Sequence, residues 1–135
     1  MSFHKNWNTL YESGRHNSVW PWTDVIVKVK RHVKPSPGNK VLELGTGPGA
    51  NIPFFLDMGI DYFGIEGSAS AVDQILERFP DLAGNLVVGD FTKELPFNYQ
   101  FDFIVDRGSL THNDAAGIRS ALALVDKCLK PGGMI

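Results

Sequence analysis

From residue 40 to its end, the chain alternates between two hydrophobic patterns. Short apolar runs that predict β-strands are followed by segments whose apolar residues recur every three or four positions, as on one face of a helix. The strand candidates are residues 40–44, 60–66, 86–88 and 101–105, and the helix candidates are residues 50–58, 71–79 and 118–129. Such alternation is typical of βαβ units, so the sequence predicts an α/β fold with a doubly wound parallel sheet in three αβα layers.

Two clusters of proline and glycine residues divide the chain. The cluster Lys-Pro-Ser-Pro-Gly-Asn at residues 34–39 reads as a linker, so we predict a helical and aromatic cap over residues 1–37 and a sheet domain over residues 38–135. A second Pro-Gly-Gly cluster precedes Met134, where a fifth strand would begin. We therefore expect a partial domain, incomplete at its carboxyl-terminal side, with one sheet edge unprotected.

Composition narrows the class of protein. The 135 residues suit one domain, and 43% hydrophobic residues argue against a mainly disordered chain. A lone cysteine cannot form an internal disulfide, no apolar run approaches the length of a membrane span, and the N-terminus lacks a signal-peptide pattern. We therefore expect a cytoplasmic protein without a membrane partner.

Charge is distributed unevenly along the chain. Residues 1–40 hold seven Lys or Arg and two Asp or Glu, whereas residues 41–135 hold six and thirteen. The basic residues of segment 28–34 could contact nucleic acid, but a solvated helix face explains them more simply. We do not expect nucleic acid as a partner.

Residues 43–51, Glu-Leu-Gly-Thr-Gly-Pro-Gly-Ala-Asn, follow the first strand and open a helix. Glycines permit a tight turn and close approach of a ligand to the backbone, and the helix N-terminus adds unpaired N–H groups. Gly45, Gly47 and Ala50 satisfy a relaxed dinucleotide fingerprint, with Glu66 placed as a ribose-binding acid. Taken alone, the loop therefore does not distinguish a dinucleotide from another cofactor. It could also be a structural turn that binds no ligand.

Five motifs in a fixed order distinguish between these interpretations of the glycine-rich loop. They are Glu43-x-Gly45-x-Gly47-x-Gly49, Glu66 ending the second strand, Gly89-Asp90-Phe91 after the third, Asp102 to Asp106 around the fourth, and Leu129-Lys130-Pro131-Gly132-Gly133. With this order and spacing, residues 38–135 resemble the class I S-adenosylmethionine-dependent methyltransferases, whose fold is Rossmann-like. The resemblance implies S-adenosyl-L-methionine as cofactor and S-adenosyl-L-homocysteine as product.

The resemblance also implies roles for single residues. Glu66 would accept hydrogen bonds from both ribose hydroxyls, Asp90 would accept one from the adenine amine, and Phe91 would offer a ring face or an N–H group. Residues 45–49 would lie under the methionine and ribose. The cofactor-binding candidates are Glu43, Gly45, Thr46, Gly47, Gly49, Asn51, Glu66, Gly67, Asp90, Phe91, Asp106 and Arg107.

These candidates have structural alternatives. Glu66 and Asp90 could cap helices, and Asp106 could form an ion pair with Arg107. Asp106 is also a catalytic candidate, together with His112, which lies just beyond the fourth strand. A histidine titrates near neutral pH and can act as a general base on an oxygen or nitrogen acceptor, although His112 could equally be a loop or capping residue.

The N-terminal segment is rich in aromatic residues. In many small-molecule methyltransferases, the segment before the first strand folds over the cofactor. Tyr11, Arg15, Trp20 and Trp22 are therefore lid or substrate candidates, with Arg15 able to hold a carboxylate or phosphate. Plain packing of a helix on the sheet is the alternative. Thr23 or Asp24 is expected to cap a helix whose apolar face continues to residue 33.

The sequence thus predicts a methyltransferase that transfers the cofactor methyl group to an oxygen or nitrogen of a small molecule, with no metal site. Three alternatives remain open: an NAD(P)-dependent oxidoreductase domain, a non-catalytic module that binds S-adenosylmethionine, and a nucleic-acid methyltransferase. A homodimer is compatible with the sequence.

Overall fold

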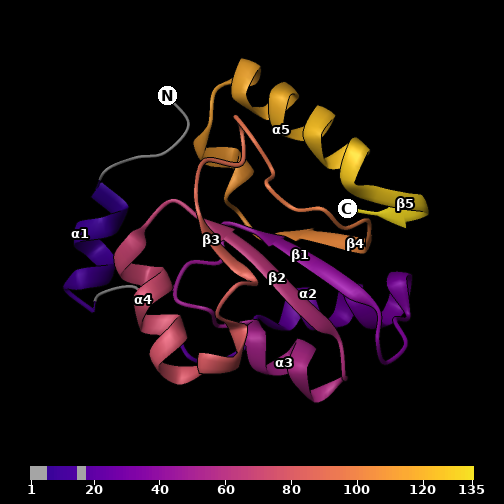
Figure 1. Ribbon diagram of the computed structural model, residues 1–135, viewed down its shortest axis with the longest axis horizontal. Helices are drawn as coiled ribbons and strands as arrows, with labels where there is room; N and C mark the ends of the chain where they lie inside the picture. Colours follow the sequence, from indigo (N-terminus) through magenta and orange to yellow (C-terminus); the bar gives the residue numbers. More distant parts are fainter. Residues whose placement is uncertain (1–5, 15–17) are drawn as a thin grey trace.

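The computed structural model describes residues 6–14 and 18–135, and its centre is a five-stranded parallel sheet (Figure 1). The strand order is β3-β2-β1-β4-β5, so the chain builds outward from β1 first in one direction and then in the other. The strands are β1 Lys40–Leu44, β2 Asp61–Glu66, β3 Leu86–Val88, β4 Phe101–Asp106 and β5 Leu129–Met134. This confirms the predicted doubly wound, Rossmann-like sheet.

Helices cover both faces of the sheet (Figure 1). They are α1 Asn6–Glu12, α2 Thr23–Lys28, α3 Ile52–Asp57, α4 Ala69–Arg78 and α5 Ala115–Cys128; the short turns are η1 Val29–Val33, η2 Pro80–Leu82 and η3 Leu110–His112. Helices α2, α3 and α4 pack on one face, whereas α5 packs on the other. In the part of the chain that the structure describes, no helix has the length and apolarity needed to cross a membrane.

The core consists of two apolar layers because successive strand residues point to opposite faces. Val41 of β1 and Phe103 of β4 face α2, α3 and α4, whereas their neighbours Leu42 and Ile104 face α5. All four side chains are buried. Burial on both faces explains why the strands read as continuous apolar runs in the sequence.

The helix that precedes the linker differs from its prediction at both ends. Its first residue is Thr23, its N-cap is Trp22, and no side chain caps it, so the expected Thr23 or Asp24 cap is wrong. The Asp24 carboxylate instead accepts a hydrogen bond from the neighbouring Val25 N–H at 2.8 Å. The last turn, η1, is wound as a π-helix and ends at Lys34 in the left-handed conformation.

The fifth strand also differs from its prediction. It begins at Leu129 rather than at Met134, because the Pro-Gly-Gly segment is part of the strand and bulges. Leu129 pairs with Phe101 and Met134 with Phe103, so six residues of β5 lie opposite three residues of β4. Beyond Phe103, β4 pairs only with β1 among the described residues.

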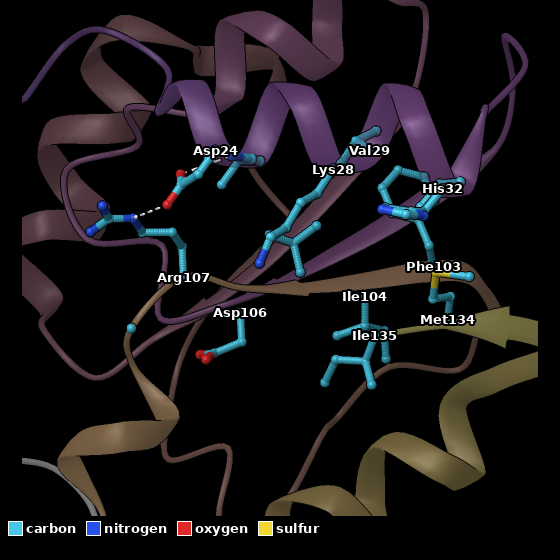
Figure 2. Close-up of a pocket in the computed structure, with 14 residues that line it drawn as sticks. Asp24, Lys28, Val29, His32, Phe103, Ile104, Asp106, Arg107, Met134 and Ile135 are labelled. Carbon is cyan, nitrogen blue, oxygen red and sulfur yellow. Dashed lines mark hydrogen bonds and ion pairs between the residues drawn. The ribbon is translucent and has the colours of Figure 1, made fainter.

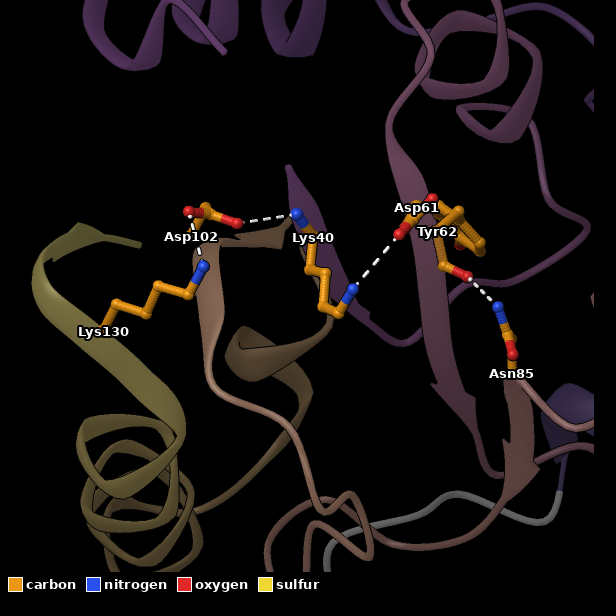
Figure 3. Close-up of polar contacts among 6 residues, drawn as sticks. All are labelled: Lys40, Asp61, Tyr62, Asn85, Asp102 and Lys130. Carbon is orange, nitrogen blue, oxygen red and sulfur yellow. Dashed lines mark hydrogen bonds and ion pairs between the residues drawn. The ribbon is translucent and has the colours of Figure 1, made fainter. Parts of the chain in front are cut away.

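Polar side chains cross the amino-terminal edge of the sheet (Figure 3). The Asp102 carboxylate of β4 accepts hydrogen bonds from the Lys40 N–H of β1 at 2.7 Å and from the Lys130 ammonium of β5 at 3.1 Å. The Lys40 ammonium in turn donates to Asp61 of β2 at 3.1 Å. One carboxylate therefore links the central strand to both β4 and β5.

The contacts with Lys40 and Lys130 change the pKa of Asp102. Burial opposes its ionisation, but the hydrogen bonds from Lys40 and Lys130, with their positive charges, lower its pKa below the ordinary 3.8. A lowered carboxyl pKa adds stability above the unfolded-state pKa, and that stability is lost as the pH falls through the folded-state pKa.

We expect Asp102→Asn to lower the free energy of unfolding by about 1–2 kcal/mol at neutral pH, because one oxygen acceptor and the charge are lost. Urea denaturation of both proteins measures the difference, which should shrink below pH 4. The matched variant Lys130→Met removes only a partly exposed ion pair, so it should cost less than about 1 kcal/mol. An equal loss in both variants would contradict a special role for Asp102.

Candidate cofactor-binding site

A cavity of about 360 Å³ lies at the carboxyl-terminal edge of the sheet, where the loops after β1, β2, β3 and β4 converge beneath α1. Open parallel sheets bind ligands at this edge. Thirteen of the predicted site residues line it: Tyr11, Trp22, Glu43, Gly45, Thr46, Gly47, Asn51, Glu66, Gly67, Asp90, Phe91, Arg107 and His112.

The glycine-rich loop after β1 has a backbone that other residues would adopt only with strain. Gly45 has φ +65°, and a Cβ there would lie 2.4 Å from the Cβ of Ser109. Gly49 has φ +80°, and its Cβ would lie 2.9 Å from both Ile52 and Ile75. Gly45 thus keeps β1 close to the loop after β4, whereas Gly49 lets the loop pack on α4 and does not line the cavity.

Glu66, the last residue of β2, joins the glycine-rich loop to the start of α4. Its buried carboxylate accepts hydrogen bonds from the Gly47 N–H at 2.7 Å and the Ser68 N–H at 3.0 Å. Burial raises its pKa, and the hydrogen bonds from Gly47, Ser68 and Gly67 oppose that rise. The capping of α4 itself falls to the Ser68 hydroxyl, which accepts from the Ala71 N–H.

Glu43 lies beneath the same loop as the centre of a buried hydrogen-bond chain. Its carboxylate accepts from the Tyr62 hydroxyl at 2.6 Å and the Asn51 side-chain amide at 2.7 Å. The amide oxygen of Asn51 then accepts from the Trp22 N–H at 3.0 Å. Tyr62 was not predicted as a partner, because a tyrosine within an apolar strand is typical of the core.

The environment of Glu43 shifts its ionisation. Burial raises its pKa to about 7, the charges of Glu66 and Asp106 add to the rise, and the hydrogen bonds from Tyr62 and Asn51 limit it. Glu43 therefore titrates near neutral pH although it is enclosed by protein.

Asp90 turns the chain after β3. Its Oδ1 atom accepts from the Thr92 N–H at 2.9 Å and the Thr92 hydroxyl at 2.6 Å, and its Oδ2 atom lies 3.7 Å from the Lys93 ammonium. The predicted alternative, a helix cap, is wrong for Asp90, because these hydrogen bonds close a turn and the next element of the described chain is β4, not a helix. The residue also lines the cavity. The Phe91 side chain packs partly into the core layer under α5.

Asp106 organises the loop after β4 rather than lining this cavity. Its Oδ1 atom accepts from the Ser109 N–H at 3.2 Å, the Leu110 N–H at 3.0 Å and the Ser109 hydroxyl. Its predicted alternative, an ion pair with Arg107, is wrong. Arg107 pairs instead with Asp24, whose Oδ2 atom lies 3.5 Å from the arginine Nε atom.

Helix α1 brings two aromatic side chains over the cavity. The Trp7 ring meets the His112 ring edge to face, with centroids 5.2 Å apart, and stacks on Tyr11 at 5.8 Å. The amide oxygen of Asn8 accepts from the Ser68 hydroxyl at 2.6 Å, which ties α1 to α4. Trp7 and Asn8 were not among the predicted site residues, because their role depends on where a short helix docks.

One lid candidate, Trp20, lies away from the cavity. Trp20 is 79% exposed and does not line the cavity, so the structure does not bring it to the site. Arg15 falls outside the residues that the structure describes. Of the four candidates, Tyr11 and Trp22 are therefore the two placed at the cavity.

A second cavity, of about 480 Å³, lies between α2 and the free side of β4 (Figure 2). Its walls are part apolar and part charged, with Val25 and Val29 on one side and Ile104 and Ile135 on the other. It includes Asp106, and it meets the first cavity at Arg107 and Gly108.

Comparison with known proteins identifies the family. Residues 41–133 match the methyltransferase domain family, which covers more than half of the chain, so the chain belongs to this family. The fold and the motif resemblance to class I S-adenosylmethionine-dependent methyltransferases are thereby confirmed, and S-adenosylmethionine is the cofactor of these proteins.

Three relatives illustrate the likeness. The chain is 40% identical over 53 residues to ribosomal RNA small subunit methyltransferase A of Parabacteroides distasonis (39% of this chain, 20% of that one). It is 29% identical over 100 residues to an uncharacterized methyltransferase of Synechocystis (73% and 46%). The glycopeptide N-methyltransferase MtfA, solved with S-adenosylmethionine, is 27% identical, with a TM-score of 0.69 over 82% of this chain and 50% of that one. The chain thus spans half or less of these relatives' lengths.

Glu43 makes stability depend on pH. Because its folded-state pKa is raised from 4.5 to about 7, the folded protein binds more protons than the unfolded chain between these values. Stability is therefore expected to fall as the pH rises from 4.5 to 7, by about 3 kcal/mol. Urea denaturation across this range measures the slope.

Glu43→Gln is the matched variant. It cannot ionise, so its stability should vary less with pH than that of the wild type, and the difference between the two slopes isolates Glu43 from Glu66. Its amide nitrogen would replace one of the two oxygens that accept from Asn51 and Tyr62, so we also expect a loss of about 1–3 kcal/mol at pH 5. Parallel slopes would show that Glu43 does not titrate in this range.

Proposed function

We propose that the cavity at the carboxyl-terminal edge binds S-adenosylmethionine and that the chain is part of a methyltransferase acting on an oxygen or nitrogen of a small molecule. One observation supports this most directly. The glycine-rich loop, Glu66 and Asp90, at three adjacent strand ends, line one cavity in a chain that belongs to the methyltransferase domain family.

The residues present fit the cofactor chemically. In our proposal, Glu66 accepts hydrogen bonds from the ribose hydroxyls, Asp90 accepts one from the adenine amine, and Phe91 flanks the adenine. The loop from Gly45 to Gly49 lies under the methionine and ribose. The backbone N–H groups of Gly47 and Ser68 already hold the Glu66 carboxylate, so its orientation is fixed before a ligand arrives.

When bound, S-adenosylmethionine supplies an activated methyl group and leaves as S-adenosylhomocysteine. The protein has to orient the acceptor, exclude water and remove the acceptor's proton where it has one. We assign proton removal to the His112 imidazole at the cavity wall, against Trp7. Asp106, which holds the backbone of Ser109 and Leu110, positions the turn that carries His112.

The division at residue 38 is part of the same proposal. Helix α1 and Trp22 belong to the cap, and both contribute walls to a cavity whose floor is the sheet domain. Closure by aromatic side chains suits a small acceptor, which supports the proposed substrate class. Cytoplasmic location and a homodimer remain predictions from the sequence.

Nucleic acid is a second candidate acceptor, favoured by the 40% identity over 53 residues to a ribosomal RNA methyltransferase. It would require cations on the binding surface, and the basic residues of segment 28–34 are the available group. RNA binding that weakens steeply with salt would support this alternative.

The first test is a thermal-shift titration of the chain with S-adenosylhomocysteine and, separately, NAD. A ligand at ~100 times its dissociation constant adds about 2.7 kcal/mol of stability, so the midpoint should rise with S-adenosylhomocysteine alone. A rise with NAD alone would overturn the proposal in favour of an oxidoreductase domain.

Glu66→Ala is the variant arm of this test. Removing the carboxylate should weaken S-adenosylhomocysteine binding by about 2–3 kcal/mol, because two ribose hydroxyls lose their acceptor. Calorimetric titration measures this loss, with the exposed Glu77→Ala on α4 as control. Unchanged affinity of Glu66→Ala in a folded protein would remove the ribose role.

His112→Ala should leave S-adenosylhomocysteine affinity unchanged and slow methyl transfer about 10²-fold or more, as expected when a general base is lost. Transfer of labelled methyl groups to an acceptor found by screening the full-length protein measures the rate. Thr111→Ala is the control, because this neighbouring residue is exposed and does not line the cavity. Equal rates in His112→Ala and wild type would make His112 structural.

A further inference from the structure

The first cavity has acidic side chains on one side and a basic side chain on the other. Its acidic side chains are Glu43 near the end of β1, Glu66 at the end of β2 and Asp90 just after β3. Arg107, after β4, is the one lysine or arginine among the described residues that line it. A ligand that fills the cavity therefore meets hydrogen-bond acceptors at one side and a guanidinium at the other.

The position of Arg107 is fixed by two contacts. Its Cζ atom lies 3.8 Å from the centroid of the Trp22 ring. Its Nε atom lies 3.5 Å from Asp24 Oδ2, a contact shown in Figure 2. A guanidinium stacked on an aromatic ring loses little further entropy when it binds an anion.

The residues that hold Arg107 are themselves held. The Trp22 N–H donates to the buried Asn51, which donates to Glu43. Asp24 accepts from the Val25 N–H at 2.8 Å. The stack therefore rests on the buried chain beneath the glycine-rich loop.

The rest of the guanidinium is available to a ligand. Within the described parts of the chain, neither Nη1 nor Nη2 has a hydrogen-bond partner, and Arg107 lines both cavities. In Figure 2 these two nitrogens point away from Asp24. A planar pair of N–H donors of this kind matches the two oxygens of a carboxylate.

We propose that Arg107 is the carboxylate-binding residue of this site. The inference rests on the proposed function, since two carboxylates could reach it: that of the cofactor's methionine group, or that of an acidic acceptor in the adjoining cavity. The chemistry is the same in both cases, and two probes distinguish them.

The first probe pair is S-adenosylhomocysteine and its decarboxylated analogue, S-adenosyl-3-thiopropylamine, titrated by calorimetry. With the cofactor as the source, wild type prefers S-adenosylhomocysteine by roughly tenfold or more. Arg107→Gln abolishes this preference and binds the analogue as wild type does. Arg107→Lys, which keeps the charge without the paired donors, is intermediate, and the exposed Arg119→Gln on α5 changes nothing.

The second probe pair is benzoate and benzamide, followed through the NMR signal of the Trp22 indole N–H in protein loaded with S-adenosylhomocysteine. With an acidic acceptor as the source, benzoate binds more tightly than benzamide, and Arg107→Gln removes the difference. Either result supports the proposal and identifies the carboxylate.

The proposal is overturned if Arg107→Gln alters neither preference. Wild type that fails to bind S-adenosylhomocysteine overturns the proposed function instead. In that case benzoate and benzamide titrated into the free protein decide the role of Arg107 alone. Because the Arg107 side chain is 40% exposed, its replacement leaves the core intact.

Discussion

The hydrogen-bond chain through Glu43 is the interaction on which the site depends. One buried carboxylate joins β2, through Tyr62, to the N-cap residue of α3, Asn51. Asn51 extends the chain to the backbone of Trp22. A buried carboxylate is costly unless hydrogen bonds satisfy it, so these partners are confined to one arrangement. The glycine-rich loop lies above these hydrogen-bonded residues, which hold it in one conformation.

A second carboxylate, Glu66, serves the loop from the other side. It holds the backbone of Gly47 directly, whereas Glu43 acts through side chains. The two acids thus have different roles. Glu43 holds the side chains of Tyr62 and Asn51 beneath the loop, whereas Glu66 contacts the loop backbone and lines the cavity. Their proximity raises the pKa of Glu43 further, so the site stores charge repulsion that a ligand donating hydrogen bonds would relieve.

Much of the fold could be predicted because parallel sheets bury both faces of their strands. The apolar runs of β1, β2 and β4 and the helical spacing in α4 and α5 are local signals, and the strand ends follow from right-handed crossovers. The residues that line the cavity could be predicted from the positions of the strand ends, because Glu66, Asp90 and Arg107 each lie at or just after the end of a strand. The bulge in β5 did not follow, because a Pro-Gly-Gly run reads as a turn.

The unpredicted parts depend on distant contacts. Trp7 meets His112, and Arg107 stacks on Trp22 rather than pairing with Asp106 beside it. Neither partner is encoded by spacing, because each contact requires the N-terminal segment to be placed over the finished sheet. Trp20 shows the same limit in reverse: an aromatic residue two positions from Trp22 lies in solvent.

The central position of β1 has a consequence for how the chain folds. Its partner β2 follows closely, but the hydrogen bond from Lys40 to Asp102 closes a separation of 62 residues. Loops of this length are entropically expensive to close before other contacts form. The β1–β2 half is therefore expected to form first, and the Arg107 side of the site is assembled only in the last stage of folding.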